Sequence, residues 1–189
     1  RELTPQHPVT TNFLGFFRPL DYWTWARHED VVSLDSYPDP AQPDSRQERA
    51  AHGDLMRSLG GGRPWMLMEQ ATSHVNWRDR NAAKPPGRMR LDSYQALARG
   101  ADAVLFFQWR AGRFGGEKFH SAMLPHAGTG TRVWREVSEL GAELAALGAV
   151  AGTSVRAQVA IAFDWQSWWA AEQPAQMDNA IDVLAVVAH

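Results

Sequence analysis

The chain of 189 residues is 44% hydrophobic and 21% charged, a globular composition that excludes a disordered or fibrous protein. Its formal net charge of −2 offers no basic surface, so we expect neither a nucleic-acid nor a membrane partner. The chain has no cysteine, which excludes disulfides within it and fits the cytoplasmic location that we expect. No signal peptide opens it, and no hydrophobic run approaches the ~20 residues of a membrane span.

Short hydrophobic stretches alternate with longer amphipathic ones over most of the chain. We expect strands at 8–13, 30–38, 63–69 and 101–109, and helices at 20–27, 44–60, 91–100 and 131–147. Glycines at the ends of the second and third helices are typical helix terminators. The continuous apolar run at 101–109 is typical of a strand covered on both faces. Four such β-then-α units predict an α/β protein with a parallel sheet and right-handed crossovers.

Two architectures accommodate four β-then-α units. One is a doubly wound sheet, and the other is about half of a (β/α)8 barrel, which takes ~250 residues when complete. A stretch of small residues at 148–158 follows the fourth unit, and a further strand is expected at 159–163, before Asp164. We therefore divide the chain into a unit spanning 1–150 and the start of a second domain at 151–189.

Polar and aromatic side chains stand at the C-terminal end of every expected strand. They are Thr11-Asn12, Asp35-Ser36-Tyr37, Glu69-Gln70 and Gln108-Trp109-Arg110. In a parallel barrel these strand ends lie on one face, where active sites are built. The alternative interpretation is that loops of α/β proteins are polar in any case.

Carboxylate chemistry is the reaction type that these strand ends favour. No glycine-rich phosphate motif follows a strand and no metal-ligand spacing occurs, so we expect no cofactor in this chain. Retaining glycosidases use two carboxyl groups ~5–5.5 Å apart. Glu69 at one strand end, beside Tyr37 from the preceding strand, would be oriented by the phenol and held ionised.

Several segments together resemble the β-galactosidases of glycoside hydrolase family 42. They are TTNFLGFF (10–17), DVVSLDSYP (30–38), PWMLMEQATSHVNW (64–77), GADAVLFFQWRAGRFGGEKFH (100–120) and VAIAFDWQSWWAAE (159–172). The resemblance implies that the chain holds the C-terminal half of a (β/α)8 catalytic barrel, strands five to eight. The segment from 151 to 189 would begin the second, trimer-forming α/β domain of that family.

The resemblance also implies roles for individual residues. Glu69, in the Met-Glu-Gln motif, would be the nucleophile, and Tyr37 would contact and orient it. In the loop after the fourth strand, three residues match positions that line the galactose site: Phe114, Glu117 and His120. Arg110 fits a substrate contact and a supporting ion pair equally well. We interpret Trp77 and Trp109 as core residues rather than sugar-stacking ones.

The implied activity is retaining hydrolysis of terminal β-D-galactosides by a homotrimeric full-length enzyme. The acid/base Glu of the family stands in an Asn-Glu pair after strand four, and this chain has no such pair. We therefore expect that residue upstream, together with the cysteines that bind zinc in many members. Two alternatives stay open: an incomplete barrel without activity, and a related retaining glycosidase with another sugar preference.

Overall fold

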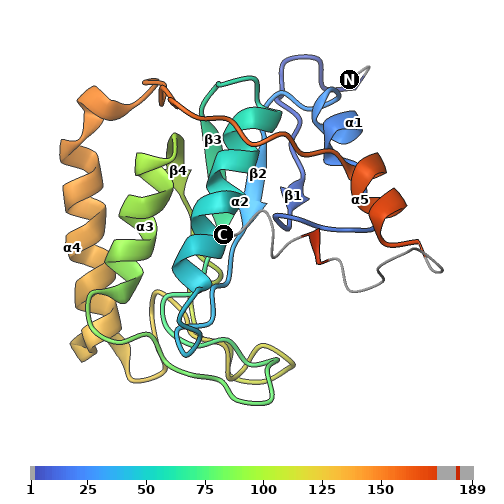
Figure 1. Ribbon diagram of the computed structural model, residues 1–189. Helices are drawn as coiled ribbons and strands as arrows, with labels where there is room; N and C mark the ends of the chain where they lie inside the picture. Colours follow the sequence, from blue (N-terminus) through green and yellow to red (C-terminus); the bar gives the residue numbers. More distant parts are fainter. Residues whose placement is uncertain (1–2, 174–181, 184–189) are drawn as a thin grey trace.

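The computed structural model describes residues 3–173 and 182–183, so 174–181 and 184–189 of the expected second domain lie outside the described residues (Figure 1). Four parallel strands form one sheet in chain order: β1 (Asn12–Phe13), β2 (Ser33–Asp35), β3 (Trp65–Glu69) and β4 (Ala101–Val104). The helices are α1 (Tyr22–Ala26), α2 (Ser45–Leu59), α3 (Arg88–Ala98), α4 (Arg132–Ala146) and α5 (Trp165–Ala171). The parallel α/β class is confirmed, whereas the assignment to strands five to eight of a barrel stays a prediction.

The regular elements differ in length from those that the sequence indicates. The expected strand 8–13 is reduced to Asn12–Phe13, and the run 101–109 is regular only to Val104. Beyond Val104, the Leu105 and Phe107 N–H groups still donate to the carbonyls of Leu67 and Gln70, at 2.8 and 3.1 Å. Helix α3 begins at Arg88 rather than residue 91, because Gly87 takes a φ of +77° and turns the chain into the helix there.

The strand expected at 159–163 is wrong. Residues 151–164 form neither helix nor strand, and the side chains of Val159 and Ile161 are strongly exposed. A strand is stable only when neighbouring strands pair with its backbone groups, and the described part of the chain places no strand beside this segment. The segment has the hydrophobic pattern of a strand, but the described part of the chain provides no neighbouring strand to pair with it.

Helix α5 packs back onto the first unit. The side chains of Trp165 and Trp168 are buried in the main hydrophobic cluster. Trp165 Nε1 donates to the carbonyl of Phe17 at 2.9 Å, and Trp169 Nε1 donates to that of Arg18 at 2.7 Å. Figure 1 shows α5 beside α1, at the β1 edge of the sheet. The division of the chain near residue 150 stays a prediction.

The helices place the core on one face of the sheet. Trp65 and Leu67 of β3 are buried in the cluster formed with α1 and α2, whereas the intervening Met66 is only half-buried. A second cluster joins α3 to α4 and includes Val137 and Leu140, as the helical spacing over 131–147 predicts. With the helices on the core side, the C-terminal strand ends remain available for loops that carry side chains of a site.

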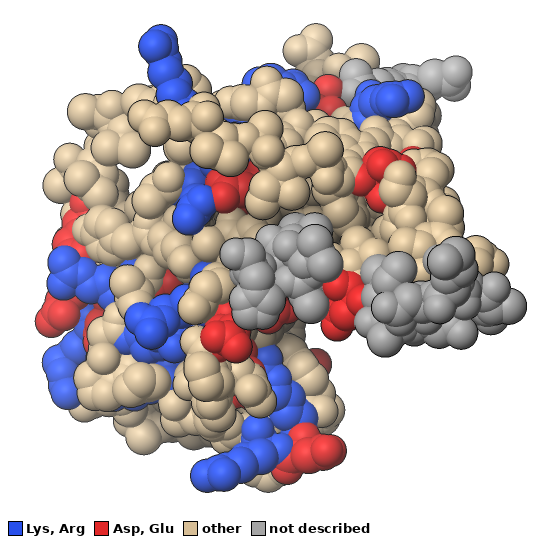
Figure 2. All heavy atoms as spheres, in the orientation of Figure 1, with Lys and Arg blue, Asp and Glu red and all other residues tan. Residues whose placement is uncertain are grey.

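The charged surface is mixed in sign. Figure 2 shows Lys and Arg interspersed with Asp and Glu over the face that it draws. No described helix combines the length and hydrophobicity needed to cross a bilayer. The absence of nucleic-acid and membrane partners and the cytoplasmic location stay predictions.

Candidate active site

Glu69 and Tyr37 form a hydrogen bond at the C-terminal edge of the sheet. Tyr37 Oη donates to Glu69 Oε2 at 2.5 Å. The pairing of β2 with β3 makes this possible, because Asp35 lies opposite Glu69 in the register. In addition, the Ser36 N–H donates to the Glu69 carbonyl at 2.9 Å. The first residue after β2 is thus tied to the last residue of β3, and the two side chains meet above them.

The phenol of Tyr37 acts as the hydrogen-bond donor in this pair. Burial raises its pKa above the ordinary value, and the hydrogen bond to Glu69 and the charge of Glu69 raise the pKa further. A phenol that keeps its proton in this way serves a carboxylate as a fixed donor. Tyr37 therefore gives Oε2 of Glu69 a hydrogen-bond donor.

Asn12 and Asp35 complete the polar surroundings of Glu69. Asn12 Nδ2 donates to both carboxylate oxygens of Asp35, at 3.0 and 2.9 Å, and lies 3.5 Å from Glu69 Oε1. Burial raises the pKa of Asp35 to about 6; the Asn12 hydrogen bond opposes this rise and the charge of Glu69 adds to it. The sequence places both residues at strand ends but indicates no role for them. Their position at the C-terminal ends of strands is the sequence feature that could have indicated a place in the site.

Asp35→Asn is expected to raise the free energy of unfolding by about 1 kcal/mol near neutral pH. Because the folded-state pKa of about 6 exceeds the ordinary 3.8, ionised Asp35 disfavours the folded state above that pKa. This cost disappears as the pH falls below 3.8, where the residue is protonated in both states. Thermal unfolding at neutral pH and near pH 4 measures the difference, and Asp79→Asn on the exposed loop is the control. A gain that is independent of pH would contradict the prediction.

An aromatic wall borders the Glu69–Tyr37 pair. The rings of Tyr37 and Trp77 meet edge to face, with centroids 5.0 Å apart, and Trp77 stacks on His120 at 5.3 Å. Trp77 is 55% exposed and Trp109 is 61% exposed, so their interpretation as core residues is wrong. An exposed indole face beside a carboxylate is a surface on which a sugar ring can stack.

His120 presents a buried acceptor to the same region. Its Nδ1 lies 2.7 Å from the carbonyl of Ser121, which can only accept, so Nδ1 carries the proton. In the neutral ring Nε2 is then an acceptor, and Nε2 is buried without a hydrogen-bond partner in the described part of the chain. Such an atom is suited to receive a hydrogen bond from a hydroxyl group of a ligand.

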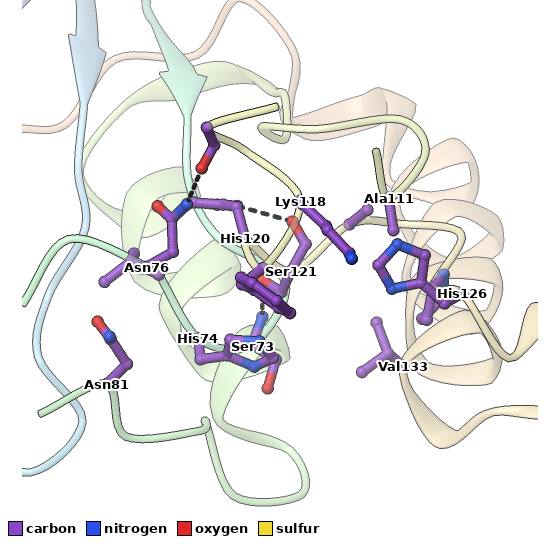
Figure 3. A pocket seen from close by; sticks show the side chains of 15 residues that line it. Ser73, His74, Asn76, Asn81, Ala111, Lys118, His120, Ser121, His126 and Val133 are labelled. Carbon is purple, nitrogen blue, oxygen red and sulfur yellow. Dashed lines mark hydrogen bonds between the residues drawn. The ribbon is translucent and has the colours of Figure 1, made fainter. Parts of the chain in front are cut away.

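His120 also lines a pocket of about 530 Å³ between the loops that follow β3 and β4 (Figure 3). The other polar side chains of this pocket include His74, Asn76, Asn81, Lys118 and His126. Glu69 and Tyr37 do not line it. The pocket is therefore a neighbour of the carboxylate site, with His120 common to both.

The remaining predicted site residues lie on the exposed loop after β4. Glu117 is exposed, and its charge is near enough to contribute to the raised pKa of Tyr37. Phe114 is also strongly exposed. Arg110 is exposed and forms no ion pair within the described ranges. The structure thus brings Glu69, Tyr37 and His120 together and leaves Phe114 and Arg110 outside that group.

The described residues contain no cluster of side chains that could bind a metal ion. Within 3–173 and 182–183, no group of three or more His, Asp or Glu side chains could hold a metal ion. The expectation that this chain carries no cofactor was made from the sequence and stays a prediction.

The sequence match over the strands and their loops decides the family. The family model for the β-galactosidases of glycoside hydrolase family 42 matches residues 1–147. The chain belongs to this family. The β-galactosidase bgaB of Geobacillus kaustophilus is 53% identical over 188 residues, which cover 99% of this chain and 28% of that relative.

Solved structures of family 42 share the fold. A catalytic mutant of Gan42B, a β-galactosidase from G. stearothermophilus, matches 100% of this chain and 29% of its own with a TM-score of 0.93 at 38% identity. The β-galactosidase from Bacillus circulans sp. alkalophilus matches 97% of this chain and 27% of its own, with a TM-score of 0.92 at 45% identity. The chain therefore spans less than a third of the length of the relatives that it matches.

Proposed function

We propose that this chain forms the part of a retaining β-galactosidase that carries the nucleophile, Glu69. The observation that supports this most is the hydrogen bond from Tyr37 to Glu69 at the open edge of a parallel sheet, in a chain of family 42. Relatives of this chain are named β-galactosidases. The substrate class is therefore a terminal β-D-galactoside.

In the first step, Glu69 attacks the anomeric carbon and the aglycone leaves, which gives a covalent galactosyl-enzyme. Tyr37 holds Oε2 of Glu69 at 2.5 Å, whereas Asn12 reaches Oε1 only at 3.5 Å. Oε1 is therefore the oxygen that attacks. In the second step, water hydrolyses the galactosyl-enzyme, and the product keeps the β configuration.

Galactose is held by the aromatic wall and by the loop after β4. Trp77 offers its exposed face to the sugar ring, and the Nε2 atom of His120 accepts from a hydroxyl group. Glu117 accepts from a second hydroxyl. A sugar without the matching hydroxyl would leave the buried acceptor unpaired, which is costly.

The acid/base residue lies outside this chain in our proposal. Retention requires a second carboxyl group ~5–5.5 Å from the nucleophile, and Asp35 beside Glu69 is already bound through both oxygens by Asn12. The Glu of an upstream Asn-Glu pair would protonate the leaving group and later activate water. A homotrimeric assembly, and zinc bound upstream, belong to the same proposal for the whole protein.

The role of Glu69 as nucleophile can be tested in a hybrid enzyme. In this hybrid, the chain replaces the matching segment of bgaB from G. kaustophilus. Incubation with 2-deoxy-2-fluoro-β-D-galactosyl fluoride is expected to trap the glycosyl-enzyme, and peptide mapping by mass spectrometry is expected to place the label on Glu69. A label on another carboxylate, or an α product by NMR, would overturn the mechanism. The Asp35→Asn hybrid is the control and should still be labelled.

Two further assays separate the alternatives. The chain without the remainder of the hybrid is expected to show no turnover of an aryl β-galactoside, because one carboxyl group is lacking. Turnover by the chain alone would contradict the position of the acid/base residue. A panel of aryl glycosides should give the highest kcat/KM for the galactoside, and a higher value for another sugar would favour the other specificity.

A further inference from the structure

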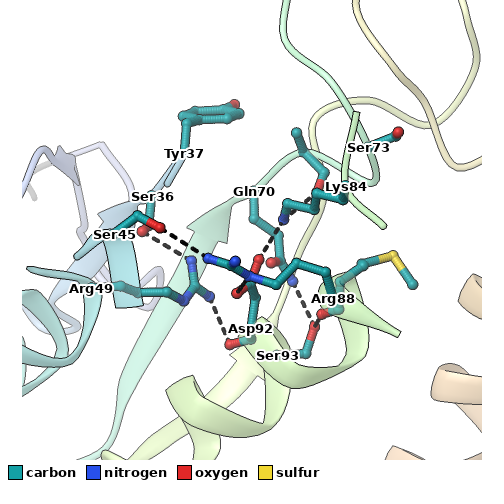
Figure 4. A network of polar contacts seen from close by, with 12 residues as sticks. Ser36, Tyr37, Ser45, Arg49, Gln70, Ser73, Lys84, Arg88, Asp92 and Ser93 are labelled. Atoms are coloured by element: carbon teal, nitrogen blue, oxygen red, sulfur yellow. Dashed lines mark hydrogen bonds and ion pairs between the residues drawn. The ribbon is translucent and has the colours of Figure 1, made fainter. Parts of the chain in front are cut away.

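A buried charge cluster lies below Tyr37 and beside Gln70, the residue that follows Glu69, in the view of Figure 4. We use this name for Arg49, Lys84, Arg88 and Asp92. Asp92 is 0% exposed, Lys84 is 3% exposed and Arg49 is 4% exposed. Asp92 Oδ1 accepts from Arg88 Nε at 2.8 Å, and Asp92 Oδ2 pairs with Lys84 Nζ at 2.9 Å. Two cations, Lys84 and Arg88, thus share one carboxylate, whereas Arg49 reaches the backbone carbonyl of the same residue.

The arrangement is costly for the folded protein. Burial lowers the pKa of Lys84 to about 8 and that of Arg49 to about 10, even though the charge of Asp92 opposes both shifts. Buried ion pairs are often no more stabilising than well-packed hydrophobic residues of similar volume. Stability alone therefore does not account for three buried or half-buried cations at this place.

The contacts of the cluster lead to both segments that carry the site. Arg49 Nη1 donates to Ser36 Oγ at 2.9 Å, and Ser36 directly precedes Tyr37. Lys84 Nζ donates to the carbonyl of Ala71 at 2.9 Å, two residues after Glu69. Arg49 Nη2 also donates to the carbonyl of Asp92 at 2.9 Å. The ends of β2 and β3 are thus fastened to one point on α3.

A hydrogen bond between two uncharged side chains lies beside the buried charge cluster. Gln70 Nε2 donates to Ser93 Oγ at 2.7 Å, and Ser93 Oγ donates to the carbonyl of Met89 at 2.9 Å. Gln70 follows Glu69 in the chain, and Ser93 follows Asp92. The segment after the nucleophile is therefore fixed to α3 directly by the hydrogen bond of Gln70, and indirectly through Lys84, which bonds to Ala71 and pairs with Asp92.

We propose that Arg49 and Lys84, held by Asp92, are positioning residues that keep Tyr37 and Glu69 in register for the reaction. This inference rests on the function proposed above. Hydrogen bonds from charged donors in a buried region are strong and directional, so they limit the movement of the backbone on either side of the pair. A nucleophile that is displaced by a fraction of an ångström loses much of its rate.

Two buried serines give a matched test in the hybrid enzyme. Ser36→Ala removes the acceptor for Arg49 next to Tyr37, and we expect kcat to fall about tenfold while KM changes less than about twofold. Ser45 is equally buried, but its Oγ accepts from Arg88 Nη2 at 3.1 Å and it lies at the start of α2. Ser45→Ala is therefore expected to change both constants less than about twofold. Equal effects of the two changes would overturn the proposal.

Lys84→Met cuts the tie to Ala71 while keeping most of the side-chain length. We expect kcat to fall by about tenfold or more with little change in KM, and Lys84→Arg to recover part of the loss because it retains a charged donor. Equal kcat values for both Lys84 variants would contradict the role of the charge. If Lys84→Met does not fold, the serine pair still tests the proposal.

A spectroscopic readout does not depend on activity. The chain has three tyrosines, so 13C labelling at Cζ gives three signals, and Tyr37→Phe assigns the one from Tyr37. Ser36→Ala is expected to shift the Tyr37 signal and to leave those of Tyr22 and Tyr94 in place, whereas Ser45→Ala shifts none. An unmoved Tyr37 signal in Ser36→Ala overturns the positioning role. The signal can also move in Ser36→Ala while Glu69 is not labelled in the hybrid. In that case the proposed function fails, but the positioning of Tyr37 by the buried charge cluster is still supported.

Discussion

Glu69→Gln is expected to lower kcat/KM of the hybrid enzyme on a nitrophenyl β-galactoside by at least about a thousandfold, which corresponds to about 4 kcal/mol of transition-state stabilisation. Glutamine has the shape of glutamate, and its amide oxygen can still accept from Tyr37, so the site geometry is retained. The neutral amide cannot form the glycosyl ester, so the covalent step is lost. KM should change little, because the nucleophile makes its bond in the transition state.

Azide supplies a second measurement of the same role. Glu69→Ala leaves space for a small anion, and added azide is expected to restore turnover with formation of α-galactosyl azide. Asp35→Asn removes a neighbouring carboxylate from the adjacent strand end and is expected to reduce kcat/KM far less. Near-normal turnover of Glu69→Gln would exclude Glu69 as the nucleophile.

Asp92→Asn is expected to lower the free energy of unfolding of the chain by about 3–5 kcal/mol at neutral pH. The substitution leaves Lys84 and Arg88 without their shared carboxylate, and Arg49 without a nearby negative charge, in a region where charge is poorly solvated. Burial raises the pKa of Asp92, but the charges of Lys84 and Arg49 outweigh this, and the pKa lies below its ordinary value. Urea denaturation of the chain and of the variant measures the loss.

Asp54→Asn is the matched control for this loss. Asp54 also bonds to two arginines, Arg57 and Arg99, but its side chain is 34% exposed. Exposed ion pairs contribute ~0–1 kcal/mol, so the control should lose far less. Since the folded-state pKa of Asp92 is lowered, its contribution is present above pH ~4 and is lost as the pH falls through that folded-state value. If Asp92→Asn loses no more free energy of unfolding than Asp54→Asn, the prediction of a large contribution from the Asp92 charge is wrong.

Local patterns in the sequence determined the class of the protein and the position of Glu69. The hydrophobic spacing over 131–147 and the glycine after residue 59 depend on neighbours within a few residues, so α4 and the end of α2 follow directly from them. Alternation of strands with helices predicts a parallel sheet, and parallel strands present their C-terminal ends on one side. Glu69 and Tyr37 therefore approach each other in any sheet that pairs β2 with β3.

Only the tertiary structure decided which side chains surround that pair. The segment 159–163 reads as a strand, yet it has no partner strand in the described chain, and pairing is a property of the whole sheet. Trp77 reads as a core residue, but its side chain is exposed beside the ring of Tyr37, which comes from the preceding strand end. Lys84 and Asp92 read as ordinary charges of a loop and a helix. They are buried only because α3 packs under the strand ends, a contact between distant segments that no local pattern encodes.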